Sequence, residues 1–212
     1  MKNIKDKIFD EQVYEHVIFE NCMIDMNELV QKKYMKCRFD YVDFSELSVI
    51  KNCIFDSCEF VSAKLNGIEF INCAFLSCNL KYTNFFAATF NQCKMTGTKF
   101  IESNFFAATI LGGDFSYTQL RYQEFMNQYF ENIRFFGADL TGCKFTKCTL
   151  KKCDFSEAIM HESSFYDSDI RQSIINNIDC SAIDLRNAQV DLSQCIAIAE
   201  NITKVRFVPE NE

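Results

Sequence analysis

The residues with the most chemical potential in this sequence are its 12 cysteines. Several of them stand five apart, in the groups Cys53/Cys58, Cys73/Cys78 and Cys143/Cys148/Cys153. Zinc sites usually space their thiolate ligands by about two to four residues and gather about four ligands around one ion. A spacing of five does not fit that pattern, so we predict no metal site and no cofactor.

The histidines offer no catalytic arrangement either. His16 and His161 are the only two in the chain, and no catalytic constellation appears around either of them. We expect both imidazoles to be solvated, and we predict that the protein is not an enzyme.

Acidic side chains are concentrated near the C-terminal end. Between Asp154 and Asp191 there are eight acids against only two basic residues, Arg171 and Arg186. The acids are Asp154, Glu157, Glu162, Asp167, Asp169, Asp179, Asp184 and Asp191. Such a cluster either binds a basic partner or only keeps the protein in solution.

The overall composition narrows the possible environments. The net charge of −7 argues against a protein that binds nucleic acid directly through a basic surface. Residues 1–9 carry lysines but no apolar stretch behind them, and no apolar run is long enough to span a bilayer. We therefore expect a cytoplasmic protein with reduced thiols and no membrane contact.

The elements that position these groups follow a repeat of five. Stepping by five from Ile50 to Cys195 gives 30 consecutive positions, and every one is apolar. Upstream, the same step runs from Phe9 to Phe44 in a frame shifted by one, so one extra residue lies within 45–49. We call these apolar positions the frame residues. Chance does not produce such a run, so the repeat reflects a structural unit.

A second track lies two residues before each frame residue. From Cys53 to Ser193, 23 of 29 such positions hold a small residue, and ten of the 12 cysteines lie on the track across both frames. The exceptions are Ile68, Gln123, Gln128, Ile133, Ile178 and Ile183. Small size suggests that the track also points inward, where buried Cys packs as a compact apolar group. A disulfide within the column Cys53, Cys73 and Cys93 is geometrically conceivable, but a reducing cytosol opposes it.

A period of five matches neither a helix nor a strand. It is explained if each frame residue points inward from a short straight face and a corner follows, so that four faces form a square coil of twenty residues. Successive coils would stack at about 4.8 Å. The segment NFFAAT occurs at 84–89 and again at 104–109, as expected for two adjacent coils. The sequence predicts an all-β solenoid.

Local motifs resemble a known family. Residues 138–142, ADLTG, match the pattern A(N/D)LXX, and residues 153–157, CDFSE, fit it closely. This pattern is typical of the pentapeptide-repeat proteins, and the resemblance covers roughly Phe9 to Cys195. It implies a right-handed quadrilateral β-helix as the fold.

The C-terminal segment departs from the repeat. Asp191 and Gln194 have the spacing of a helix capping box, and residues 204–208 alternate like a short strand. We expect a repeat domain at 1–195 and a helix-and-strand tail at 196–212. This tail resembles the one through which Qnr- and MfpA-type members dimerise, which implies a homodimer interface at Ile198, Ile202, Val205 and Phe207.

The resemblance to the Qnr- and MfpA-type members, and specifically to those without projecting loops, implies a function. These proteins imitate DNA and occupy the DNA site of gyrase or topoisomerase IV, in some cases protecting it from fluoroquinolones. The acidic band from Asp154 to Asp191 would then meet the topoisomerase. The alternative is a scaffold protein that binds another partner through an outward apolar column at Phe86, Phe106 and Met126.

Overall fold

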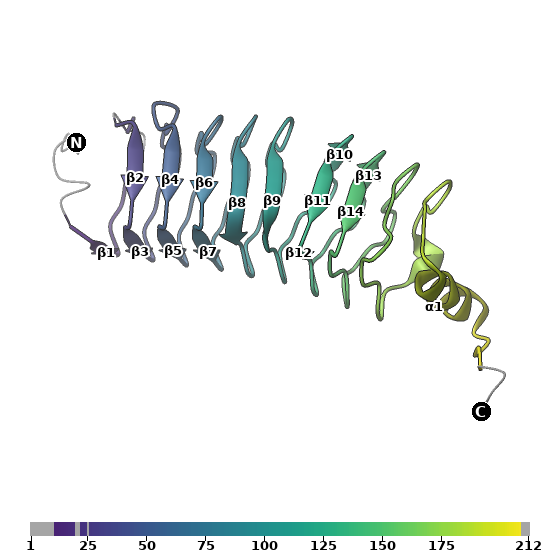
Figure 1. Ribbon diagram of the computed structural model, residues 1–212. Helices are drawn as coiled ribbons and strands as arrows, with labels where there is room; N and C mark the ends of the chain where they lie inside the picture. Colours follow the sequence, from purple (N-terminus) through teal and green to yellow (C-terminus); the bar gives the residue numbers. More distant parts are fainter. Residues whose placement is uncertain (1–10, 20–21, 25, 209–212) are drawn as a thin grey trace.

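The chain folds into a rod of stacked rectangular coils, closed at its C-terminal end by one α-helix (Figure 1). The computed structural model describes residues 11–19, 22–24 and 26–208. The predicted frame residue Phe9 lies outside these ranges. The all-β solenoid expected from the repeat of five is confirmed.

Short parallel strands form the faces of the coils. Their bounds are β1 (Val13–Glu15), β2 (Glu28–Val30), β3 (Lys33–Met35), β4 (Val49–Lys51), β5 (Ile54–Asp56), β6 (Glu69–Ile71), β7 (Ala74–Leu76), β8 (Thr89–Lys94), β9 (Thr109–Asp114), β10 (Glu124–Met126), β11 (Tyr129–Glu131), β12 (Ile133–Arg134), β13 (Lys144–Thr146) and β14 (Thr149–Lys151). Isolated β-bridges join the coils outside these strands, for example from Lys99 to Gln119. The backbone is therefore satisfied mainly between coils rather than within them.

Four faces follow one another around each coil, and we name them by their frame residues. Face A contains Phe70 and its equivalents at intervals of twenty, face B contains Phe75, face C contains Leu80 and face D contains Phe85. Strands β4, β6, β11 and β14 lie on face A, β5, β7 and β12 on face B, and β10 and β13 on face D, while β8 and β9 turn from face A into face B.

The register confirms the extra residue near position 45. Phe70 pairs with Phe90, a step of twenty, whereas Leu29 pairs with Ile50, a step of 21. The added residue lies in the corner before β4, where the Leu47 side chain turns inward and is buried. The insertion therefore changes one corner and leaves the stack of coils continuous.

The frame residues form the core. Every described frame residue from Tyr14 to Cys180 is buried. Many rings stack along the rod axis, with centroids 4.7 Å apart for Phe39 and Phe60 and 4.6 Å apart for Phe55 and Phe75. Rings from neighbouring faces meet edge to face, as Phe55 and Phe60 do at 76°. Both arrangements are favourable for aromatic quadrupoles.

The corners have one recurring backbone conformation. Of the 27 non-glycine residues with positive φ, 26 stand two positions after a frame residue. Left-handed backbone is unfavourable for residues with a Cβ atom. The fold accepts it at nearly every corner because the coil must turn there to return the chain to the next face.

The inward track is more than a set of small residues. The Cys73 thiol donates to the Ile50 carbonyl at 3.1 Å, and the Thr83 hydroxyl donates to the Phe60 carbonyl at 2.8 Å. In each case the acceptor is a frame residue 23 positions earlier. Cys, Ser and Thr of the track therefore act as hydrogen-bond donors to the preceding coil as well as being small.

The C-terminal end is capped by a helix. A 3-10 helix, η2 (Cys180–Ala182), precedes the last repeats, and α1 (Leu192–Thr203) follows them. The Gln194 amide donates to the carbonyls of Ile170 and Ser173 at 2.6 and 2.7 Å, and the Asn201 amide donates to the Ile178 carbonyl at 3.0 Å. These side chains take the place of the next coil.

Two details of the tail differ from the sequence prediction. Residues 204–208 form no strand, because a strand needs a neighbour and none of the described residues pairs with them. Lys204 instead ends α1 in a left-handed cap. Cys195, the last predicted frame residue, lies on α1 and is exposed, because the capping box at Asp191 starts the helix before the frame ends.

The inward and outward positions predict different effects of mutation. Phe105 is 3% exposed and Phe106 is 73% exposed. Phe105→Ala should lower the free energy of unfolding by about 3–5 kcal/mol, because it leaves a cavity in the core, whereas Phe106→Ala should change it by less than about 0.5 kcal/mol. Urea unfolding of the two variants measures the difference, and equal losses would contradict the assignment.

Candidate functional site

The acidic residues near the C-terminal end occupy two kinds of position. Asp154, Asp169, Asp179 and Asp184 each stand directly before a frame residue, and their carboxylates accept the backbone amide two residues on at 3.0–3.2 Å. The neutral Asn84 side chain does the same for the Phe86 amide at 3.0 Å. The first role of these aspartates is therefore to hold the corner that follows each frame residue.

Three of these carboxylates are also paired with arginine. Asp169 accepts two hydrogen bonds from Arg171, at 2.8 and 2.7 Å, and Asp184 accepts two from Arg186, at 2.8 and 2.9 Å. Asp154 lies 3.5 Å from the Arg134 guanidinium.

The arginines change how much charge these aspartates present. The hydrogen bonds from Arg171 and Arg186 lower the pKa of Asp169 and of Asp184, respectively, below the usual value. Both carboxylates stay ionised, but much of their charge is balanced within the chain and is less available to a partner.

Three other acids stand at the corners themselves, and we call Glu157, Glu162 and Asp167 the corner acids. Their φ angles are 62°, 59° and 56°. Glu157 and Asp167 accept hydrogen bonds from the amides of Asn177 and Asn187, and none of the three has an ion-pair partner among the described residues. They occupy three successive corners, so this part of the acidic band surrounds the rod rather than lining one side.

Asp179 and Asp191 cap the two helices. Asp179 accepts from the Ser181 amide and hydroxyl at the start of η2, and these hydrogen bonds lower its pKa. Asp191 accepts from the Ser193 hydroxyl and the Gln194 amide at the start of α1. Hydrogen bonds from Ser193, Gln172 and Gln194 lower the pKa of Asp191 to about 2.

The predicted apolar column lies on the outside of face D. Phe86, Phe106 and Met126 are 46%, 73% and 64% exposed. The rings of Phe86 and Phe106 are stacked, with centroids 6.0 Å apart and planes 15° apart. The structure places the three side chains outward and in sequence along the rod, as the repeat predicts.

The predicted dimer residues divide into two groups. Ile202, Val205 and Phe207 are 50%, 56% and 52% exposed, whereas Ile198 is half-buried against the core cluster. Ile198 therefore helps to seat α1 on the last coil. Leu192, at the start of α1, is 77% exposed and joins the exposed apolar side chains of the tail.

Nine of the ten cysteines of the track are buried, and Cys22 is half-buried. Burial raises the pKa of Cys73 and Cys143 to about 12, and that of Cys93 and Cys153 to about 11. Within the described part of the chain, no group of three or more His, Cys, Asp or Glu side chains is placed to hold a metal ion. All 12 thiols are free.

A family model for pentapeptide repeats matches the sequence in eight copies, over residues 53–92 and 133–172. The buried frame, the small track and the four-faced coil extend the same unit beyond these segments. The chain therefore contains pentapeptide repeats in both matched segments.

Solved structures of QnrB1 show the same fold. A trypsin-treated form of QnrB1, described as a plasmid-mediated fluoroquinolone resistance protein, is 19% identical, with a TM-score of 0.73 over 92% of this chain and 100% of that chain. Full-length QnrB1 gives 0.66 at 20% identity, covering 90% and 99%. HetL, involved in heterocyst differentiation regulation in the cyanobacterium Nostoc, gives 0.46 at 12%, covering 84% and 86%.

At 19% and 20% identity, the likeness to QnrB1 establishes the fold alone. A search of curated protein sequences finds no significant match. Among the residues that the structure describes, no helix has the length and apolar character needed to cross a membrane.

The cysteine environment of this pentapeptide-repeat protein predicts slow thiol chemistry. Only Cys195 is exposed and Cys22 half-buried, while the remaining ten thiols are buried. An aromatic disulfide reagent should label about one or two thiols in the native protein and all 12 in denaturant. Rapid native labelling of most thiols, or stoichiometric zinc in the purified protein, would contradict the packing role.

The Asp191 cap predicts a specific loss of stability in acid. Its pKa falls from 3.8 to about 2 on folding, so the stabilisation is fully present above about pH 4 and is lost as the pH falls toward 2. Asp191→Asn keeps a cap oxygen but cannot ionise. The variant should therefore lose less stability than the parent between pH 5 and pH 2, measured by urea unfolding. An identical pH dependence would contradict the assignment.

Proposed function

We propose that this pentapeptide-repeat protein binds a type II topoisomerase, gyrase or topoisomerase IV, in place of DNA and protects it from fluoroquinolones. The observation that carries the proposal is the extent of the likeness to QnrB1. It spans 92% of this chain and all of the QnrB1 chain, so the length of the rod matches as well as its repeat. QnrB1 is described as a fluoroquinolone resistance protein.

The surface charge supports this proposal. A DNA-binding groove is basic, and its lysines and arginines bind phosphates at regular spacing. The corner acids Glu157, Glu162 and Asp167 present carboxylates at successive corners of the rod, and none of them is paired with a cation of the described chain. We expect these three to make the dominant contacts, because Asp169 and Asp184 are already paired with Arg171 and Arg186.

In this proposal the protein acts as a homodimer joined through the tail. Leu192, Ile202, Val205 and Phe207 expose apolar surface beside the capped end, where a second copy related by a two-fold axis would bury it. Two copies joined there would place both sets of corner acids near the centre of one long rod. In this proposal the protein is a cytoplasmic binding protein without a cofactor, and it binds neither DNA nor membranes itself.

The apolar column favours a second candidate function. Phe86 and Phe106 form an exposed stacked pair, and Met126 is exposed at the next equivalent position along face D. Surface apolar groups in contact with one another are more typical of a binding site than isolated ones. The protein would then be a scaffold that binds an apolar segment of another protein on face D.

The topoisomerase proposal is tested by competition with DNA. The triple variant Glu157→Gln/Glu162→Gln/Asp167→Asn should compete at least about tenfold more weakly for gyrase or topoisomerase IV than the parent, in fluorescence anisotropy with labelled duplex DNA. Its competition should also depend less on salt, because charge contacts have been removed. The matched control is Glu15→Gln/Glu28→Gln/Glu46→Gln, which removes three exposed acids from the other end of the rod.

Two further variants distinguish the topoisomerase proposal from the scaffold function. Ile202→Glu/Phe207→Glu should yield monomers by light scattering and weaken competition, if the tail forms the dimer. Phe106→Ser/Met126→Ser should leave competition unchanged. Equal competition by the corner-acid variant and its control would reject DNA mimicry, and a loss with the face D variant alone would favour the scaffold function.

A further inference from the structure

The ladder between coils is interrupted at one place in the rod. On face A, β9 pairs with β8, and β11 pairs with β14, but β9 and β11 do not pair with each other. Figure 1 shows the wider interval between these two strands. On face D, Asn84 is bridged to Asn104. Among the described residues, Asn104 is not bridged in turn to Glu124. We call this interruption the seam.

The seam crosses only two of the four faces. On face B, Gly113 pairs with Ile133, and on face C, Lys99 is bridged to Gln119 and Gln119 to Asp139. The two coils are therefore joined along one pair of adjacent faces and unjoined along the other pair.

The core confirms that the coils are farther apart on face D. Along its column of frame residues, the ring centroids of Phe85 and Phe105 are 5.2 Å apart, and those of Phe125 and Phe145 are also 5.2 Å apart. Across the seam, Phe105 and Phe125 are 6.5 Å apart, with an edge-to-face arrangement at 70°. The packing loosens at the same place as the hydrogen bonds.

The repeated segment NFFAAT shows which hydrogen bonds are missing. In its first copy, the amides of Phe85 and Ala87 donate to the carbonyls of Asn104 and Phe106 at 2.8 and 3.1 Å. In its second copy, the amides of Phe105 and Ala107 donate to no backbone carbonyl of the described chain. Six identical residues are therefore bonded to the next coil in one place and not in the other.

Two glutamines on the inward track explain the interruption. Gln123 and Gln128 occupy the track on faces D and A, the two faces where the ladder fails. The Gln128 amide donates to the Ala108 carbonyl at 3.0 Å. One coil earlier, the equivalent Ala88 carbonyl accepts the Thr109 backbone amide at 2.9 Å. The side chain has taken an acceptor that the ladder would use.

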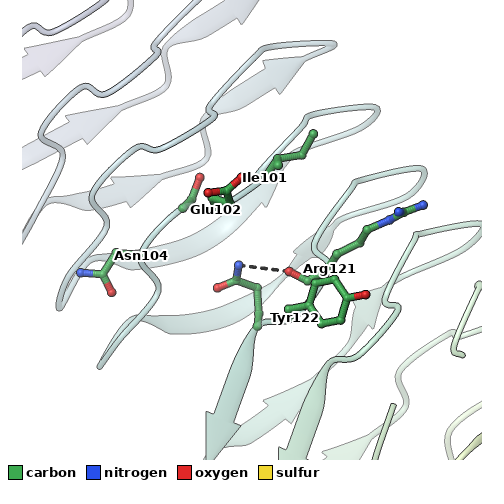
Figure 2. Close-up of a pocket in the computed structure, with 7 residues that line it drawn as sticks. Ile101, Glu102, Asn104, Arg121 and Tyr122 are labelled. Atoms are coloured by element: carbon green, nitrogen blue, oxygen red, sulfur yellow. Dashed lines mark hydrogen bonds between the residues drawn. The ribbon is translucent and has the colours of Figure 1, made fainter. Parts of the chain in front are cut away.

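Gln123 acts in the same way on face D. Its amide donates to the Arg121 carbonyl at 3.4 Å, the bond drawn in Figure 2. One coil earlier, the equivalent Ile101 carbonyl accepts the Tyr82 backbone amide at 3.0 Å. The hydrogen bond of Gln123 is long, so it competes weakly and a backbone donor can displace it.

Side-chain bulk alone does not interrupt the ladder. Ile68 and Ile133 also occupy the track, yet both remain joined to the preceding coil: the Glu69 amide donates to the Ser48 carbonyl at 2.9 Å, and Ile133 pairs with Gly113. Competition by the glutamine amides is therefore the decisive feature. The open arrangement is itself imperfect, because the Gln128 side-chain oxygen is buried without a hydrogen-bond partner among the described residues.

The seam also leaves space into which the coils can move. A hollow of about 510 Å³ lies at the corner of faces C and D, with Ile101, Glu102 and Asn104 on one coil and Arg121 and Tyr122 on the other (Figure 2). A second, of about 250 Å³, lies on face A and is lined in part by Leu111, Gly112 and Tyr129.

We propose that the seam is a joint at which the two halves of the rod bend. The continuous ladder on faces B and C acts as the hinge, and faces D and A close when backbone amides displace the glutamine side chains. Closing brings Met126 toward Phe106, so the apolar column on face D becomes continuous only in the closed form. A partner that covers both side chains would favour that form.

Amide hydrogen exchange, measured residue by residue by NMR, tests the joint. Because NFFAAT is repeated, intrinsic exchange rates are closely matched between the two copies. Phe105 and Ala107 should exchange at least about 100-fold faster than Phe85 and Ala87. In Gln123→Ile/Gln128→Ile, which keeps bulk but removes the amides, the seam amides should slow at least about tenfold. Gln119→Ser, an outward change on the same coil, is the control and should alter nothing at the seam.

Cross-linking distinguishes a moving joint from a fixed gap. Asn104→Cys/Glu124→Cys places thiols across the seam, and a disulfide forms only if their Cα atoms approach to about 4.4–6.8 Å. Asn84→Cys/Asn104→Cys is the control pair on the intact ladder. Both pairs should cross-link, identified by mass spectrometry. Equal protection of the two NFFAAT copies, unchanged exchange in the isoleucine variant, or cross-linking of the control pair alone would each overturn the proposal.

Discussion

The interior of each coil has room for one large and one small side chain per face, and the rest of the structure depends on this limit. It fixes Phe or another large apolar group at every fifth residue, and it restricts the position two before it. The rings then stack along the axis, as Phe39 and Phe60 do at 4.7 Å. Because side chains fill the interior completely, the backbone satisfies its hydrogen bonds between coils, and the fold becomes a rod with a regular surface.

The same limit gives some surface side chains of this protein a role in the fold itself. An aspartate before a frame residue, such as Asp169, holds a corner through the Arg171 amide and at the same time binds the Arg171 side chain. Its charge is thus part of the fold's own hydrogen bonding. A corner acid such as Glu162 has no such duty among the contacts of the described residues, and its charge is available to the surroundings. Position within the repeat, rather than the number of acids, decides which charges a partner meets.

Much of the fold follows from the sequence, because the repeat is a strictly local rule applied many times. The inward Phe105, the outward Phe106 and the extra residue near Leu47 are all read from the frame. The rule fails where hydrogen-bond competition matters. Gln123 and Gln128 stand out in the sequence as exceptions of size, but size does not reveal that their amides take carbonyls from the ladder. The strand expected at 204–208 fails for a related reason, since alternation cannot supply a neighbouring strand.

The helix at the C-terminal end also bears on how copies of this protein can associate. A stack of parallel coils is a template onto which a further coil, from any chain, can add by edge pairing. At this end, the side-chain amides of Gln194 and Asn201 donate hydrogen bonds to backbone carbonyls that a further coil would otherwise use. Growth of a continuous fibre from this end is therefore blocked, while the apolar flank of α1 remains open. The cap thus permits a closed pair of molecules and opposes open-ended polymerisation.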